Sequence, residues 1–495
     1  MVWHGKPAGK REGSASSSRS SRWRSSRGAT LFTWCGQIGA PKVFDYSPIL
    51  APTLRVADGG PLYCDFRTTS LVPMLYGPIV PFVAAHLSDV FGHGAVAVLA
   101  AGRSITILST LMVCALVFSL AQFTGASRLS SAIAALGFMI SPLVQLWGFE
   151  FRADMPALAF NLAGVFAFET GLCPLAIVLF AGAFFAKQGQ FYGIATIVLS
   201  LCIGRDFRRA ATIGAAWAIV TGVVIAVMQC VTSWYWLNTF GALAGYYDIS
   251  APLSLLRHNI VLNAMLVLLG GCSLFRFGLN QMGCLFLLAL AENSMDSLRW
   301  GSNFYYFLPT IAAAAILAPA ALDSLFDWAD SRRVAFQVMC GVFVAITFSA
   351  GTVIDVVRNP SAPIAEAVRP VAVRDHCVVN YWDSGALRKL KSIDGTIIID
   401  SPELMFVDHR SNIRFIEPMV LGAMKSHGTF DDSHLISSIR RREIAAFVFG
   451  PEGLNLEWRG RKFFWPELRD AIEANYDKLS SACVPVVMMP KRSSK

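Results

Sequence analysis

Charged side chains near the ends of apolar segments are the residues of this sequence best suited to chemistry. Three are carboxylates and three are cations: Asp45, Asp65, Asp154, Arg152, Lys187 and Arg299. Ionisable groups at membrane depth are costly, so a protein retains them mainly for function or for topology. A carboxylate can take the proton from an attacking hydroxyl, and Arg or Lys can bind a phosphate and stabilise the charge it gains on leaving. Together these residue types suit the transfer of a group from a lipid phosphate.

Each of these residues also has a structural explanation. Asp154 stands where an apolar helix is expected to begin, so its carboxylate could satisfy free amides at the positive end of the helix dipole. Arg152 could be an end-of-span residue whose charged head reaches the interface. The functional interpretation requires several separate segments to bring these groups to one face.

The composition indicates which elements must position them. Apolar residues make up 54% of the 495 residues and charged residues only 15%, whereas a soluble domain carries about 25% charge. We therefore expect an α-helical polytopic membrane protein. About eleven apolar segments are expected, several of them shorter than the roughly 20 residues of a full span. They are 104–122, 131–148, 154–170, 172–186, 190–204, 210–230, 235–248, 258–274, 279–292, 304–322 and 334–354.

Two short basic connections orient the chain. Arg205–Arg209 and Arg332–Arg333 are predicted to be cytoplasmic because Lys and Arg concentrate on that side. The count of spans between them omits 235–248, which is rich in Trp, Tyr and Gly and is expected in the membrane interface. That count places the following on the opposite, outer side: Asp154, Lys187, Arg257, Arg299 and everything after about residue 356.

Composition divides the chain into four parts. Residues 1–40 are Ser- and Arg-rich, which predicts a disordered basic tail and leaves an organellar targeting peptide open; no span is expected before Asp45. Residues 41–100 are too rich in Gly and Pro for a plain spanning helix, so we expect a first outer loop with an interfacial helix near 79–90. Residues 101–356 are expected to form the transmembrane helical domain, and residues 370–495 an extracytoplasmic domain.

The last part alternates between strand and helix patterns, which predicts a small α/β domain. Strands are expected at 376–382, 396–400, 444–449 and 484–489, and helices at 432–441 and 466–476. Cys377 and Cys483 flank this domain, and whether they pair is left open. The chain has no CxxC or HExxH motif, so no metal ligands are predicted. The domain has no Gly-rich phosphate loop, so we assign it no chemistry of its own.

The order of several short motifs resembles a known family. The run Gly59-Gly-Pro-Leu-Tyr-Cys-Asp65 and then Tyr76-Gly-Pro78 resembles the first outer loop of bacterial polyprenyl-phosphate-sugar-dependent glycosyltransferases, relatives of protein O-mannosyltransferases and aminoarabinose transferases with the GT-C fold. Further landmarks follow in that family's order: Gly102-Arg103, Arg152-Ala-Asp154, Lys187-Gln188 and Gly301-Ser-Asn303-Phe-Tyr305. The resemblance covers roughly residues 43–325.

The resemblance implies roles for these residues. Asp45 would be the general base, Asp154 a second carboxylate, and Asp65 the competitor for the first role. Lys187, Arg152, Arg299 and Asn303 would contact the donor's phosphate. Two features depart from the family, which has a span directly before the base and often an acidic residue close to it. Here the sequence before Asp45 is polar, and Ser47 or Pro48 stands in place of the acidic residue.

The resemblance also implies partners. The donor would be a polyprenyl-phosphate sugar; the acceptor would be a glycan, a lipid or a protein outside the cytoplasm; and the protein would lie among the lipids of the inner (plasma) membrane. A net charge of +9, concentrated at the N-terminus and in short loops, is not a nucleic-acid signature. Outer carboxylates are also compatible with Mg²⁺ or Mn²⁺. Three alternatives stay open: a transporter or flippase of a lipid-linked saccharide, a catalytically degenerate family member, and a scaffold whose outer domain binds a partner.

Overall fold

The structure is a computed structural model that describes most of the chain after residue 46. The described residues are 47–68, 71–243, 246–299, 302–330, 393–400, 413–449, 453–455, 457–458, 461–479 and 486–491. Several predictions therefore lie outside the described residues: Asp45, the apolar segment 334–354, the strand at 376–382 and both Cys377 and Cys483.

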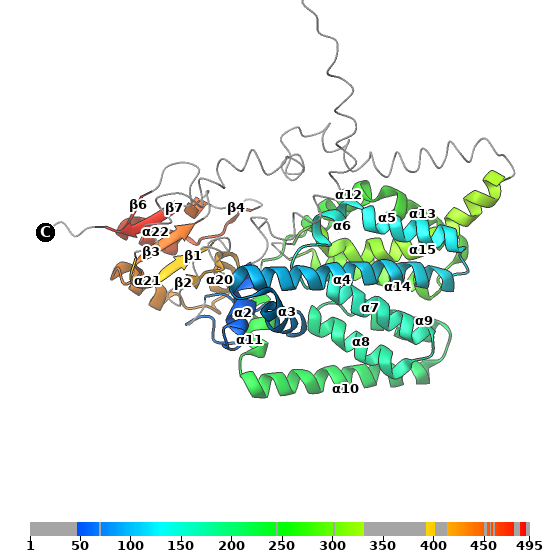
Figure 1. Cartoon of the computed structure of the whole chain (residues 1–495), viewed down its shortest axis with the longest axis horizontal. Coiled ribbons are helices and arrows are strands. Elements are labelled where there is room, and N and C mark those ends of the chain that lie inside the picture. The colour runs from blue at the N-terminus through cyan, green and yellow to red at the C-terminus, as the bar shows by residue number, and fades with distance from the viewer. Residues whose placement is uncertain are drawn as a thin grey trace, which may run out of the picture. The chain divides into compact units, whose positions relative to one another are not determined.

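Helices make up the described chain from Ser47 to Asp330 (Figure 1). They are α2 Ser47–Ala57, α3 Ile79–Phe91, α4 Gly94–Phe123, α5 Arg128–Ile140, α6 Pro142–Trp147, α7 Asp154–Glu169, α8 Cys173–Ala186, α9 Tyr192–Ile203, α10 Phe207–Thr232, α11 Tyr235–Thr239, η1 Gly241–Leu243, α12 Ala251–Leu262, α13 Ala264–Phe277, α14 Gln281–Asp296, η2 Phe304–Phe307 and α15 Leu308–Asp330.

Several of these helices are suited to a membrane. Among the described residues, Gly94–Phe123, Phe207–Thr232 and Phe304–Asp327 are long and apolar enough to cross one, and the α12–α13 pair qualifies together although it bends by 97°. Four shorter apolar helices pack among them. Along α10 the apolar side chains of Ile219, Val223 and Val227 are exposed, as expected where a helix faces lipid. The predicted polytopic helical class is confirmed.

The sequence misplaced some boundaries. Helix α4 begins at Gly94 instead of near residue 104, and α2 lies where only loop was expected. The segment 131–148 is broken into α5 and α6, because Pro142 has no backbone N–H to continue the first helix and instead begins the second. The segment 235–248 contains the short helices α11 and η1.

Helices α7 to α10 run up and down as two successive hairpins. A turn with Gly171 in the left-handed region (φ +81°) joins α7 to α8, and Arg209, at the start of α10, returns to that turn. Its guanidinium donates to Cys173 Sγ at 3.5 Å and lies 5.0 Å from the Phe168 ring. The start of α7 and the end of α8 are thus at the end of these helices away from the basic Arg205–Arg209 loop. The span count from the sequence likewise placed Asp154 and Lys187 on the side opposite the Arg205–Arg209 loop.

The C-terminal part is an α/β unit, as predicted. Its main sheet has the strand order β2-β1-β3-β7-β6, with β1 parallel to β2 and β3, and β7 antiparallel to both β3 and β6. Strands β1 Ile397–Ile399, β3 Ala446–Phe449 and β7 Val486–Pro490 fall where the sequence predicted them, as do helices α21 Ser433–Arg440 and α22 Pro466–Asn475. The further elements are β2 Ile413–Phe415, α20 Pro418–Ser426, η4 Gly453–Asn455, β4 Glu457–Trp458, β5 Arg461–Lys462 and β6 Tyr476–Lys478.

The loop between α2 and α3, residues 58–78, contacts this α/β unit and is called here the first loop. Phe66, Leu71 and Leu75 are buried in one apolar cluster with α20, α21 and α22, and Val72 packs against the opposite face of the sheet. The backbone N–H of Glu417, directly before α20, donates to Leu71 O at 3.0 Å. The first loop is therefore part of the core of the C-terminal unit.

Candidate functional site

A buried cluster of three charged side chains forms where α7 begins and α8 ends. Lys187 Nζ donates to Asp154 Oδ1 at 2.6 Å, and Arg152 Nε donates to Asp154 Oδ2 at 3.1 Å. All three residues are less than a tenth exposed. The hairpin explains the meeting, because the first residue of α7 and the residue after α8 must lie at the same end. The structure thus joins three residues that the sequence singled out separately.

Aromatic rings line the cationic side of this cluster. The Arg152 guanidinium lies 3.7 Å from the Tyr305 ring centroid and 5.4 Å from that of Trp147. Lys187 Nζ lies 4.3 Å from the Tyr306 ring. Ring faces attract cations electrostatically, and most strongly where water is excluded. The rings therefore help to keep two cations buried around one carboxylate.

The charge of this cluster does not cancel. Two cations and one carboxylate give the trio a net charge of +1. The charge of Asp296 also interacts with that of Lys187, and the charge of Arg299 with that of Asp296, so the five groups together still carry +1. Burying net charge is expensive unless it is paired. A site of this kind favours an anionic ligand.

The segment that leads into α7 is fastened to α4. Arg103 Nη2 and Glu150 Oε2 form a buried ion pair at 3.5 Å. A side chain at Gly102 would overlap the Phe151 ring, with a Cβ only 2.1 Å from its Cδ2. Gly102 is therefore required for this close approach, which fixes the residues immediately before Arg152.

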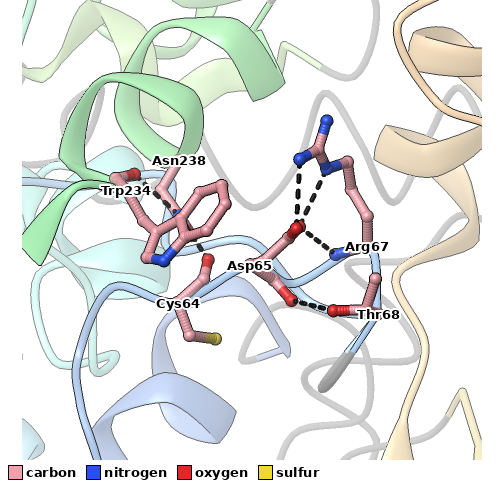
Figure 2. Close-up of polar contacts among 6 residues, drawn as sticks. All are labelled: Cys64, Asp65, Arg67, Thr68, Trp234 and Asn238. Atoms are coloured by element: carbon pink, nitrogen blue, oxygen red, sulfur yellow. Dashed lines mark hydrogen bonds and ion pairs between the residues drawn. The ribbon is translucent and has the colours of Figure 1, made fainter.

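Two buried amide side chains hold the first loop against the cluster. Asn238 Nδ2 donates to Cys64 O at 2.9 Å (Figure 2). Its Oδ1 accepts from Met74 N at 2.9 Å. Gln188, next to Lys187, donates to the carbonyl of Leu75 and to Thr239 O. Asn238 thus joins two points of the first loop to α11. Gln188, the residue after Lys187, joins the first loop to Thr239 at the end of the same helix.

Close backbone packing completes this attachment. A Cβ on Gly77 would lie 1.9 Å from Phe185 O, so only glycine fits there. Tyr63 donates its hydroxyl to Tyr76 O at 3.0 Å, and the Tyr76 hydroxyl accepts from Arg152 Nη2 at 3.5 Å. The first loop therefore reaches the charged cluster through Tyr76.

Asp65 lies in a separate ion pair. Arg67 Nε and Nη2 donate to its two carboxylate oxygens at 2.8 and 3.0 Å, as Figure 2 shows. These hydrogen bonds lower the pKa of the Asp65 carboxyl below its ordinary value. The Arg67 guanidinium also lies 5.8 Å from the Trp234 ring. Asp65 is thus held as a carboxylate on its own turn, with its basicity reduced.

The remaining predicted residues have mainly backbone or capping contacts. Arg299 forms an isolated β-bridge with Tyr247, and its charge interacts with that of Asp296. Asn303 caps η2, since its Oδ1 accepts from Phe304 N at 2.7 Å. This cap begins the short helix that carries Tyr305 and Tyr306. Asp45 lies outside the described residues, so its role stays a prediction.

Metal ligands do not cluster in the described residues, where no group of three or more His, Cys, Asp or Glu could hold an ion. The compatibility of the outer carboxylates with Mg²⁺ or Mn²⁺ stays a prediction.

The fold and the site together describe a polytopic helical membrane protein with a buried charged cluster at one end of its helices. The solved structures agree with this. The chain is similar to ArnT from Cupriavidus metallidurans bound to undecaprenyl phosphate, with a TM-score of 0.59, 14% identity, and coverage of 94% of this chain and 97% of that chain. The apo state of ArnT matches with a TM-score of 0.58, 15% identity and coverage of 93% and 96%. No family model and no curated protein sequence matches.

Proposed function

We propose that this protein is a membrane glycosyltransferase that moves a sugar from a polyprenyl-phosphate donor to an acceptor outside the cytoplasm. The observation that carries the proposal is the buried Arg152–Asp154–Lys187 cluster, with its net charge of +1, in a chain that shares the fold of ArnT. That ArnT structure contains undecaprenyl phosphate. A donor of the same chemical class would bring a phosphate to a site that favours an anion.

The chemistry of the transfer fits such a site. An acceptor hydroxyl attacks the anomeric carbon of the sugar, and the bond from that carbon to the phosphate oxygen breaks. The electron pair leaves with the phosphate, whose negative charge rises from one towards two. Cations that contact the leaving phosphate stabilise this charge most in the transition state. Arg152 and Lys187 are the residues for this role.

The acceptor's proton goes to a general base. Asp45 takes this role by its position in the motif order, and Asp65 is the competitor. Asp154 is poorly suited to it, because both of its oxygens accept from the cations. We assign Asp154 the role of holding Arg152 and Lys187 in place between the two helix ends.

The charges of the loops indicate which side of the membrane the cluster faces. The basic Arg205–Arg209 loop lies at the opposite end of the α7–α10 hairpins from the cluster. Basic short loops are cytoplasmic, so the cluster faces the other side of the plasma membrane. A glycan, lipid or protein on that side could reach it.

The test is sugar transfer by the purified full chain in lipid nanodiscs, given a panel of radiolabelled polyprenyl-phosphate sugars. We expect turnover of a donor by the wild-type chain and loss of turnover in Asp45→Asn. Asp89→Asn is the matched control, because Asp89 is an exposed carboxylate on α3. Full activity of Asp45→Asn would exclude that residue as the base.

A second outcome separates the alternative functions. A labelled donor that binds without turnover, but crosses the bilayer of proteoliposomes, would replace the transferase with a lipid-linked saccharide transporter. Binding with neither turnover nor transport would identify a degenerate transferase.

A further inference from the structure

A cavity of about 340 Å³ opens in the C-terminal unit beside the start of α22. Its walls include Lys462, Phe463, Trp465 and Arg469, and Tyr246, from the segment before α12, also lines it. Ligand cavities in proteins start at about 300 Å³, so the volume suits a small ligand or one unit of a larger one. None of the charged-cluster residues lines it.

The aromatic wall of the cavity is fixed in place. Trp465 Nε1 donates to Asp432 Oδ2 at 2.6 Å, and the Trp465 ring meets Phe430 edge to face at 5.9 Å. Lys425 Nζ contacts the other oxygen of Asp432 at 2.5 Å, which balances the charge of that carboxylate. A large ring held this way loses little conformational entropy when a ligand stacks on it.

The polar part of the cavity is cationic. The lining contains two cations, Lys462 and Arg469, and no carboxylate among the described residues. Arg469 Nε is buried and has no hydrogen-bond partner in the described part of the chain. A buried donor without a partner costs free energy, and a turn of the guanidinium towards an anionic oxygen in the cavity would remove that cost. Lys462 is exposed and adds a second positive charge.

We propose that this cavity binds a negatively charged sugar unit of the acceptor, at a distance from the point of transfer. Ring faces cover the apolar C–H surface of a sugar, as Trp465 and Tyr246 could here, and guanidinium binds carboxylate or phosphate through charge-assisted hydrogen bonds. The assignment to the acceptor rests on the proposed transferase function, whereas the binding of an anionic sugar does not.

The binding test uses the full chain in nanodiscs without any donor, and saturation-transfer NMR with four probes. Glucose 6-phosphate and glucuronate should bind, while glucose and inorganic phosphate should each bind at least about tenfold more weakly, because each lacks one half of the recognition. Arg469→Met should weaken binding of the charged sugars roughly tenfold, and Arg469→Lys should recover part of it. Lys462→Met should weaken it about two- to threefold, as expected for an exposed cation.

Two cations elsewhere in the unit provide matched controls. Arg440 and Lys478 are exposed and line no part of the cavity, so Arg440→Met and Lys478→Met should bind as the wild type does. Equal binding of glucose and glucuronate would overturn the proposal, as would binding that Arg469→Met leaves unchanged. Absence of binding by all four probes would overturn it as well. Capture of an acidic peptide in place of the charged sugars would assign the cavity to a protein partner.

The transfer assay separates this proposal from the proposed function. With donor present, Arg469→Met should raise the KM for a charged acceptor about tenfold, whereas Arg440→Met should leave that KM unchanged. If the wild-type chain shows no turnover of any donor but still binds charged sugars, the proposed transferase function is wrong and the proposed binding site is supported.

Discussion

Lys187→Met and Asp154→Asn should destabilise the chain by very different amounts, although both disrupt the same 2.6 Å contact. The reason is the charge that each variant leaves behind. The wild-type trio carries +1, Lys187→Met leaves a neutral Arg152–Asp154 pair, and Asp154→Asn leaves two buried cations with a charge of +2. Asp296 is unchanged in both variants.

The magnitudes follow from these charges. Removal of one partner from a buried ion pair costs about 3–5 kcal/mol when the other charge is left uncompensated. Asp154→Asn meets that condition twice, so we expect the upper part of this range. In Lys187→Met, Arg152 still neutralises Asp154 at 3.1 Å, so we expect a loss of about 1 kcal/mol, comparable to one net hydrogen bond.

The two variants should also differ in activity and in how much a ligand stabilises them. Lys187→Met should lower kcat roughly 100- to 1,000-fold, the effect of removing one group that stabilises developing charge. Added polyprenyl phosphate should raise the Tm of Asp154→Asn more than that of the wild type, because an anion restores the missing charge.

The assays are thermal unfolding in nanodiscs with and without polyprenyl phosphate, and transfer kinetics. Arg128→Met is the control, since Arg128 is an exposed cation at the start of α5. Wild-type kcat in Lys187→Met would refute the assignment of Lys187 to the leaving phosphate. Equal loss of stability in the two variants would refute the charge argument.

Three further predictions concern the groups that position the site. Gly77→Ala should destabilise the chain by about 1–3 kcal/mol or more, because its Cβ would lie 1.9 Å from Phe185 O. Gly222 on α10 has open space around it, so Gly222→Ala should not destabilise the chain in the same thermal unfolding assay. Asn303→Ala should lower the stability by about 1 kcal/mol through loss of the η2 cap, and Asn303→Ser should recover most of that loss. If the Ser variant keeps the stability but has a raised KM for the donor, Asn303 contacts the phosphate instead. The lowered pKa of Asp65 means that the Asp65–Arg67 pair contributes stability above the ordinary carboxyl pKa of 3.8. That stability is lost as the pH falls through the folded-state value, so Arg67→Met should flatten this acid loss in a Tm titration.

The sequence predicted the charged members of the site because of where they occur. Arg152, Asp154 and Lys187 stand at the ends of apolar segments, and ionisable residues near membrane depth are rare enough to be informative. The parity of the spans then placed Asp154 and Lys187 at the same end, and the hairpin of α7 and α8 brings them to 2.6 Å. Parity cannot give distance, so the contact itself required the structure.

The aromatic and amide members were much harder to find. Tyr76 and Tyr305 were visible only as parts of the ordered motifs, and Tyr306 and Trp147 carried no signal because aromatic residues are common in membrane helices. Asn238 lies 164 residues from Met74, to which it is hydrogen bonded. A polar residue in a short Trp- and Tyr-rich segment was interpreted as interfacial, and its long-range pairing depends on tertiary packing alone.

The first loop makes the site and the C-terminal unit interdependent. Phe66, Leu71 and Leu75 are buried in the core of that unit, and Gln188 beside Lys187 binds the Leu75 carbonyl. Without the C-terminal unit these three side chains would face water, and the hydrophobic effect would no longer hold the loop in its present path. Because the hydroxyl of Tyr76 contacts Arg152 from this loop, a change in its path would reach the charged cluster directly. The C-terminal unit therefore contributes to the geometry of the charged cluster although it supplies none of the three charged residues.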